Sequence, residues 1–174
     1  SAAADAAVLT ADRQQGLNMG PDTVIAGVRM AGGITYARHE VLTIDLGAGD
    51  DTVSVRGTPY RSDFQTWTML DTGSGNDAVD VDLEAGVDGR FALDTAAGND
   101  TVDAVNSSLP LVVFGGTGSD TIGDGIGDDI IFGDRGRVDF IDAQGRVVTR
   151  LGTAPADRAG TADSAPAAGL VDAD

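Results

Sequence analysis

The stretch Gly115-Gly116-Thr117-Gly118-Ser119-Asp120-Thr121-Ile122-Gly123 contains the pattern that decides the fold. Part of it, Gly-x-Asp-x-aliphatic, recurs along the chain. Such self-similarity is the sequence signature of repeat architectures, in which each unit packs on its neighbours. The other copies begin at Gly49, Gly75, Gly98 and Gly127, and an outlying match begins at Gly20.

Two further features indicate that the copies are in register. A second glycine stands two residues before the repeat glycine at Gly47, Gly73, Gly116 and Gly125, and Ala96 takes this position in the remaining copy. The repeat glycines are separated by 29, 26, 23, 20 and 9 residues. The first four spacings shorten by three residues each time. This regularity indicates a solenoid whose coils taper, or it is a coincidence over four intervals.

The residues that flank each motif alternate between apolar and polar, which is typical of a strand with one buried face. Before the motif, the inward positions are Ile44, Leu70, Leu93 and Val113. After it, the aliphatic positions are Val53, Val79, Val102, Ile122 and Ile131. Each repeat therefore predicts a strand, a Gly/Asp turn and a second strand. Stacked repeats predict an all-β fold, a parallel β-helix or β-roll solenoid.

The composition is acidic in an unusual way. The chain has a net charge of −17, and 26 of its 28 acidic residues are Asp. This charge argues against binding to nucleic acid and to anionic membranes, both of which need an excess of Lys and Arg. The absence of Cys excludes disulfides, thiolate nucleophiles and Cys-ligated zinc. The short Asp side chain suits tight turns, so the acidic residues are predicted to lie in turns.

Stacking the repeats places carboxylates above one another, and like charges on neighbouring strands destabilise a sheet. One predicted column contains Asp51, Asp77, Asp100 and Asp120, and a second contains Asp45, Asp71 and Asp94. Divalent cations between the turns would remove this repulsion. Ca²⁺ prefers oxygen ligands from carboxylates and backbone carbonyls, and glycine turns can present carbonyls at unusual backbone angles. We therefore expect about four or five Ca²⁺ ions.

The repeats resemble the nonapeptide G-G-x-G-x-D-x-aliphatic-x of the RTX, or haemolysin-type, calcium-binding family. Residues 115–123 match at every specified position, and residues 124–132 lack only the first glycine. The resemblance implies side-chain ligands at Asp51, Asp77, Asp100, Asp120 and Asp129. It implies backbone carbonyl ligands at Gly47, Gly49, Gly73, Gly75, Gly98, Gly116, Gly118, Gly125 and Gly127. In the β-roll of this family two nonapeptides form one coil, whereas here only the last spacing is nine residues.

The function implied by this resemblance is structural. The chain is expected to be a calcium-binding repeat segment of a secreted or cell-surface bacterial protein, such as an adhesin, a matrix protein or an extracellular fibre, and not an enzyme. Contact with identical or sequential segments is expected to be head-to-tail, because the open ends of a solenoid must be covered. Two alternatives stay open. One is a carbohydrate-active parallel β-helix of the lyase or epimerase type, and the other is a secretion or folding module of an exported enzyme.

Several residues invite other interpretations. His39 and Glu40 are adjacent, but a catalytic dyad needs a nucleophile and a third group, so a strand-edge or core histidine is favoured. Trp67, with Tyr60 and Phe64, suggests a sugar-binding aromatic strip or, preferably, a plug that packs a long loop against the solenoid. Asp22 follows Pro21 in the outlying match, which favours a plain turn.

The chain divides into four predicted regions. Residues 1–15 are Ala-rich and predict a short helix or a linker, and residues 16–136 predict the calcium-binding solenoid. Residues 137–151 predict a β-hairpin. Residues 152–174 are rich in Ala, Gly, Pro and Asp, and predict a tail or linker.

Overall fold

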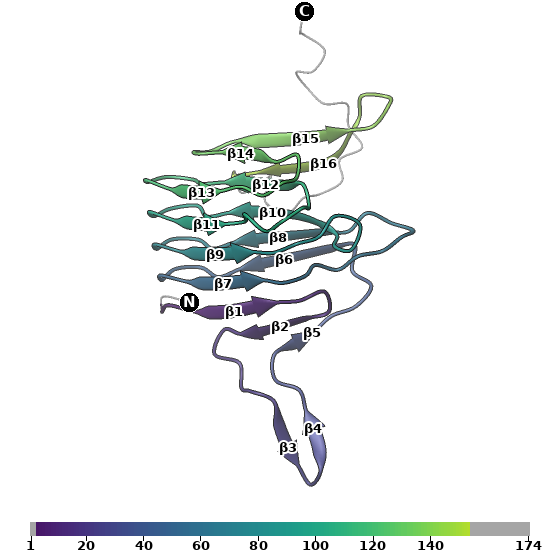
Figure 1. Ribbon diagram of the computed structural model, residues 1–174, viewed down its shortest axis with the longest axis vertical. Coiled ribbons are helices and arrows are strands. Elements are labelled where there is room, and N and C mark those ends of the chain that lie inside the picture. The colour runs from purple at the N-terminus through teal and green to yellow at the C-terminus, as the bar shows by residue number, and fades with distance from the viewer. Residues whose placement is uncertain (1–2, 154–174) are drawn as a thin grey trace, which may run out of the picture.

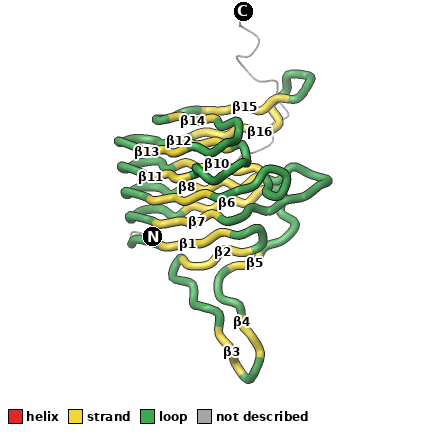
Figure 2. Tube along the Cα trace, in the orientation of Figure 1, coloured by secondary structure: helices red, strands yellow, loops and turns green. Residues whose placement is uncertain are grey.

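The computed structural model describes residues 3–153, and every regular element in this range is a β-strand. Two stacks of parallel strands face each other and form a solenoid (Figures 1 and 2), so the expected all-β solenoid is confirmed. The five-stranded sheet contains β6 (Val41–Asp45), β8 (Trp67–Asp71), β10 (Arg90–Asp94), β12 (Leu111–Phe114) and β14 (Ile130–Phe132). The parallel part of the seven-stranded sheet contains β1 (Ala6–Leu9), β7 (Thr52–Val55), β9 (Ala78–Val81), β11 (Thr101–Asp103) and β13 (Thr121–Gly123).

Successive coils become shorter, although their strands stay in register. Ile44 pairs with Leu70, Leu70 with Leu93, Leu93 with Val113, and Val113 with Ile131. The Gly/Asp turns stay nearly constant, whereas the returns on the opposite edge shorten along the chain. These returns comprise residues 56–66, 82–89, 104–110 and 124–129. The spacings of 26, 23 and 20 residues therefore reflect shortening of one edge only, whereas the spacing of 29 does not correspond to a coil, because Gly20 lies beside the antiparallel hairpin of β3 (Thr23–Ile25) and β4 (Val28–Met30).

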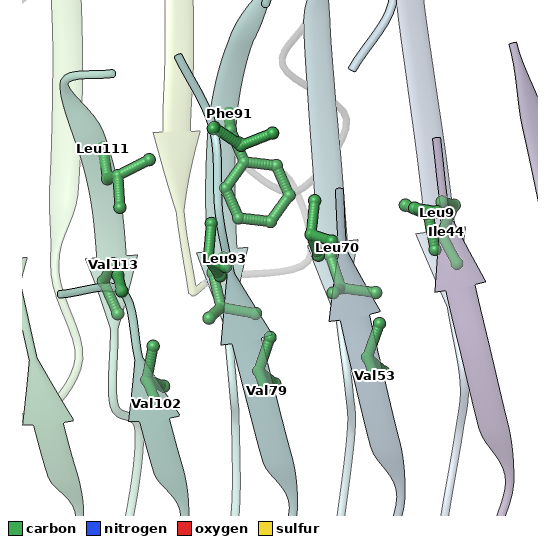
Figure 3. Close-up of a cluster of buried hydrophobic side chains, with 14 of the residues drawn as sticks. Leu9, Ile44, Val53, Leu70, Val79, Phe91, Leu93, Val102, Leu111 and Val113 are labelled. Atoms are coloured by element: carbon green, nitrogen blue, oxygen red, sulfur yellow. The ribbon is translucent and has the colours of Figure 1, made fainter. Parts of the chain in front are cut away.

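The core lies between the two sheets, where alternate residues of each strand point inward. Figure 3 shows the stacked side chains, with Phe91 and Leu93 between the aliphatic residues of neighbouring coils. Val53, Val79 and Val102 face them from the other sheet, and each is at most 2 % exposed. The inward positions predicted from the alternation are thus the core, apart from those of the last coil.

The outer face of the five-stranded sheet is also covered. Strands β15 (Arg137–Ile141) and β16 (Val147–Gly152) form an antiparallel hairpin, where the sequence predicts one over residues 137–151. Val138, Phe140 and Leu151 of this hairpin pack against Trp67, Met69, Ala92, Val112 and Phe114 of the sheet. A sheet that is covered on both faces needs strands that are apolar on both faces. This explains the continuous burial of β8 and β12.

The N-terminal region differs from expectation. Within residues 1–15, where a helix or linker is predicted, the structure has β1, which pairs in parallel with β7. β2 (Arg13–Gly16) and β5 (Ile34–Thr35) then extend the same sheet with antiparallel strands. Between them, β3 (Thr23–Ile25) and β4 (Val28–Met30) form a hairpin that projects from the end of the solenoid (Figure 1). The first parallel strand, β1, therefore lies before residue 16, and the antiparallel segment from β2 to β5 separates it from the parallel coils that follow from β6. Most of the predicted tail, from residue 154 onward, lies outside the described residues.

Glycine is required at the turns because neighbouring coils approach closely there. Gly75 has a φ of 143°, and a Cβ at this position would overlap the carbonyl oxygen of Gly49 in the preceding coil. We predict that Gly75→Ala lowers the free energy of unfolding by about 3 kcal/mol, since it combines a strained φ with a backbone clash. Urea unfolding followed by circular dichroism measures the change.

Gly133→Ala is the matched control for this substitution. Nothing lies within 4 Å of a Cβ at Gly133, and this glycine has no positive φ. The control is expected to change the free energy of unfolding by less than about 0.5 kcal/mol. Equal effects of the two substitutions would show that the close stacking of the turns does not limit stability.

Candidate cation-binding edge

Four of the five Gly/Asp turns lie on one edge of the solenoid, where each connects a strand of the five-stranded sheet to a strand of the seven-stranded sheet. We call this the turn edge; it comprises residues 46–51, 72–77, 95–100 and 115–120. The turns are stacked in parallel by bridges from Ala48 to Ser74, from Ser74 to Ala97 and from Ala97 to Thr117. Equivalent motif residues of successive coils therefore lie directly above one another.

The first predicted column is confirmed, and a ladder of hydrogen bonds connects its aspartates. The backbone N–H of Asp51 donates to Oδ1 of Asp77 at 2.8 Å, and the N–H of Asp77 donates to Oδ1 of Asp100 at 2.8 Å. The N–H of Asp100 donates to Oδ1 of Asp120 at 3.0 Å. Asp5 extends the ladder at the other end, with its N–H 2.6 Å from Oδ1 of Asp51. Each aspartate thus satisfies a backbone donor in the preceding coil.

The neighbouring motif position forms a second ladder in the opposite direction. The N–H of Asn76 donates to Oδ1 of Asp50 at 2.7 Å, and the N–H of Asn99 donates to Oδ1 of Asn76 at 2.9 Å. The N–H of Ser119 continues the ladder to Oδ1 of Asn99 at 2.9 Å. Hydrogen bonding alone therefore explains why both positions of the motif are polar, and why each needs a side-chain oxygen close to the backbone.

We call the ladder from Asp51 to Asp120 the inner ladder. The second carboxylate oxygen, Oδ2, of its buried aspartates differs from Oδ1 in its hydrogen bonding. Asp51, Asp77 and Asp100 are at most 2 % exposed, and the Oδ2 atom of each is buried without a hydrogen-bond partner. An unsatisfied buried oxygen costs about 1–3 kcal/mol, and more when it is charged. Hydrogen bonding within the turns thus leaves a row of carboxylate oxygens that need a proton or a cation.

The electrostatics of the column favour the same conclusion. Burial raises the pKa of Asp77 and of Asp100, and the neighbouring carboxylates of the column raise it further. Hydrogen bonds from the preceding coil and from Thr72 or Thr95 lower these pKa values, but they do not cancel the effect of burial. The folded chain therefore holds protons at these positions more tightly than the unfolded chain does.

The atoms available at this edge are oxygens, which suits a hard cation such as Ca²⁺. In residues 3–153, no three acidic or histidine side chains converge as a metal cluster, so backbone carbonyls would have to complete any site. The carbonyls of Gly47 and Gly73 accept N–H bonds from Ser74 and Ala97, and each has a second lone pair. The carbonyl of Gly49 points at the α-carbon of Gly75. The predicted donors Gly98, Gly116 and Gly118 occupy the same two positions of the later turns.

Asp129, the fifth predicted ligand, lies on the opposite edge, in the return between β13 and β14. Its Oδ1 accepts the N–H of Leu111 at 2.8 Å and its Oδ2 accepts the N–H of Gly125 at 3.2 Å. The structure therefore does not bring Asp129, Gly125 and Gly127 together with the other predicted ligands. Two nonapeptides form the last coil, and this puts their aspartates on opposite edges.

Asp88 has the same role as Asp129 two returns earlier, and the sequence pattern misses it. It accepts the N–H of Thr58 and the N–H of Glu84, each at 2.8 Å. Gly86-Val87-Asp88 begins like the motif, but Arg90 occupies the aliphatic position. A search that relaxed this position would have found Asp88.

The second predicted column is also confirmed by the strand register, since Asp45 pairs with Asp71 and Asp71 with Asp94. These residues lie at the ends of the strands of the five-stranded sheet, on the face that the β15–β16 hairpin covers. Asp71 and Asp94 are buried, whereas Asp45 is exposed. This second column therefore lies beside the turn edge, but its aspartates are not members of the hydrogen-bonded ladder from Asp51 to Asp120.

The residues behind the alternative interpretations are not arranged as a site. Trp67 is buried, and its ring centroid lies 5.2 Å from that of Phe140 in the β15–β16 hairpin. Tyr60 and Phe64 are exposed on the return formed by residues 56–66, so they do not form an aromatic strip with Trp67. His39 is exposed and lies 6.4 Å, between ring centroids, from Tyr36.

We found no match to this chain among protein-family models, curated proteins or solved structures. The resemblance to calcium-binding nonapeptide repeats therefore depends on the motifs themselves.

The raised pKa values of the column predict how stability depends on pH when no divalent cation is present. The folded state binds protons more tightly, so the contribution of Asp100 to stability is complete below its unfolded pKa of about 3.8 and is lost as the pH rises. Asp100→Asn removes this titration and keeps a side-chain oxygen for the N–H of Asp77. We predict that the variant gains stability relative to the unsubstituted chain as the pH rises from about 4 to 7. The folded fraction by circular dichroism, in excess chelator and at a fixed concentration of the osmolyte TMAO that favours the folded state, measures the difference.

Asp50→Asn is the control, because it makes the same change in charge at the exposed ladder, where later coils already have asparagine. Because the exposed Asp50 carboxylate also raises the pKa of Asp77, this variant is expected to gain stability with pH in the same direction but less than Asp100→Asn. An equal or larger gain for Asp50→Asn would show that burial does not perturb the column.

Proposed function

We propose that this chain is a calcium-stabilised structural segment of a secreted or cell-surface bacterial protein. The observation that carries the proposal is the row of buried Oδ2 atoms of Asp51, Asp77 and Asp100, which the hydrogen bonds of the fold leave unsatisfied. Ca²⁺ between stacked turns would bind these oxygens together with backbone carbonyls. Its charge would replace repulsion within the column by attraction.

The net charge supports the same proposal. Binding of about four or five Ca²⁺ would reduce the charge from −17 to about −9 or −7, close to the range typical of small soluble domains. Extracellular calcium modules bind with dissociation constants of about 10⁻⁴ to 10⁻³ M. Such sites fill outside the cell, and thus the chain would fold after export. Metal binding and folding are then one equilibrium.

A structural role is proposed in place of catalysis because the aspartates of the turns and returns accept hydrogen bonds that join neighbouring coils. Asp88 and Asp129 have both carboxylate oxygens bound to backbone N–H groups, and the turn-edge aspartates have one each. A catalytic acid or base must reach substrate, whereas these groups are turned towards neighbouring coils.

We predict that Ca²⁺ converts a largely unfolded chain into the β-solenoid. In excess chelator the far-ultraviolet circular dichroism is expected to show little β-structure, and titration with Ca²⁺ is expected to restore it cooperatively. Mg²⁺ at the same concentration is expected to be less effective, because it demands a stricter geometry and retains its water. A chain that is fully folded in chelator, and that binds no Ca²⁺ by isothermal titration calorimetry, would contradict the proposal.

Asp100→Asn and Asp129→Asn form a matched pair that separates ligation from hydrogen bonding. Asp100→Asn is expected to weaken Ca²⁺ binding roughly tenfold, which corresponds to about 1.4 kcal/mol. Asp129→Asn is expected to lower stability by about 1 kcal/mol at every calcium concentration. Because binding and folding are coupled, it shifts the calcium midpoint only by the amount that this loss of stability accounts for. The reverse pattern would assign the cation to the opposite edge.

A further inference from the structure

The N-terminal end of the solenoid core is covered by the chain itself. Leu17 packs against the core cluster, and Tyr36 is buried with its hydroxyl donating to the carbonyl of Thr10 at 2.7 Å. The antiparallel strands β2 and β5 extend the seven-stranded sheet beyond the last parallel strand. This end therefore has the polar, irregular cap that a repeat array needs for solubility.

The C-terminal end is not covered in this way by the described residues. β13 and β14 are the last strands of their sheets, and each pairs with a neighbour on one side only. Ile131 continues the inward column of Val113, but it is 39 % exposed where Val113 is 2 % exposed. Ile126, in the adjoining return, is 82 % exposed. The end of the core thus presents apolar side chains to solvent, which marks an interaction surface.

The projecting β3–β4 hairpin presents a second apolar surface. Ile25 lies opposite Val28, and Thr23 lies opposite Met30, so these side chains share one face. Ile25, Val28 and Met30 are between 53 % and 63 % exposed. A two-stranded hairpin with such an exposed face is marginal in water by itself.

The base of this hairpin is held firmly. Asp22 forms ion pairs with Arg13 and Arg29 and accepts the N–H of Gly32 at 2.8 Å. These partners lower the pKa of Asp22. The outlying motif match at Asp22 is therefore an anchor for the hairpin, and it keeps the apolar face away from the solenoid.

We propose that the β3–β4 hairpin of one copy covers the C-terminal end of the core of a second copy. The two surfaces are apolar, and exposed charges of opposite sign stand near them. Arg29 lies on the other face of the hairpin, opposite Val24, and its side chain is 71 % exposed although it pairs with Asp22, whereas Asp124 and Asp128 are exposed in the return that contains Ile126. Within one molecule the two surfaces lie at opposite ends of the solenoid (Figure 1), so the contact joins different molecules.

This contact is heterologous, since each copy contributes a different surface. Repetition of a heterologous contact forms open chains or filaments unless the rotation closes a ring. The inference rests on the structural role proposed above but not on the calcium chemistry of the turn edge. It specifies which surfaces join the copies head-to-tail.

Sedimentation velocity in saturating Ca²⁺ tests the inference, with circular dichroism on the same samples to confirm folding. The unsubstituted chain is expected to sediment faster as its concentration rises. Val28→Asp in the hairpin and Ile126→Asp at the C-terminal end are each expected to weaken association at least tenfold. Val87→Asp is the control, because Val87 is 56 % exposed but lies in the return formed by residues 82–89, two returns before the one that contains Ile126.

A mixture of the two variants gives the sharper result. Val28→Asp retains an intact C-terminal end, and Ile126→Asp retains an intact hairpin, so together they form one good contact. The mixture is expected to contain dimers that do not grow further, although each variant alone is monomeric. A folded chain that stays monomeric at all concentrations would overturn the inference and leave the calcium proposal intact. Equal weakening by Val87→Asp, or no dimer in the mixture, would also overturn it.

Discussion

The fold depends on one constraint, namely that backbone N–H groups in the Gly/Asp turns find their acceptors in the neighbouring coil. Asp77 accepts from the coil before it, and Asn76 donates its N–H to that same coil. Both bonds require equivalent residues to lie directly above one another, since a shift of one residue would break the two ladders together. The ladders thus fix the register at the turn edge, where the strands themselves are short.

The other parts of the coil can vary because the turn edge fixes the register. The returns shorten from residues 56–66 to residues 124–129 without any shift in strand pairing. In the returns, Asp88 and Asp129 tie each segment to the previous one by side-chain bonds to backbone N–H groups. The solenoid therefore has one edge of constant length, the turn edge, and one edge of variable length. At the turn edge the same side chain can recur directly above itself in every coil.

The sequence predicted the fold well where its signals are local. Alternation of apolar residues and the glycine motif gave the strands, the core and the column from Asp51 to Asp120, because each signal lies within one repeat. The position of Asp129 was not predictable in the same way, since an identical motif serves either edge, and the length of the return decides which. Trp67 was predicted to plug a long loop or to belong to a sugar-binding strip, and its actual partner, the β15–β16 hairpin, is distant in the sequence. The β3–β4 hairpin has no repeat partner, so the pattern could not separate it from the solenoid.

The buried column also explains why hydrogen bonding and cation binding are not competing accounts of the motif. A carboxylate has two oxygens, and the ladder uses Oδ1 of Asp51, Asp77 and Asp100 while Oδ2 of each stays unsatisfied. An asparagine would satisfy the same N–H without charge, and the second ladder, formed by the neighbouring motif position, does contain asparagine at positions 76 and 99. The inner ladder contains aspartate in every coil, although burial disfavours its charge. An aspartate at each buried position is expected if the charge itself is needed, and the proposed cation shared between coils would supply that need.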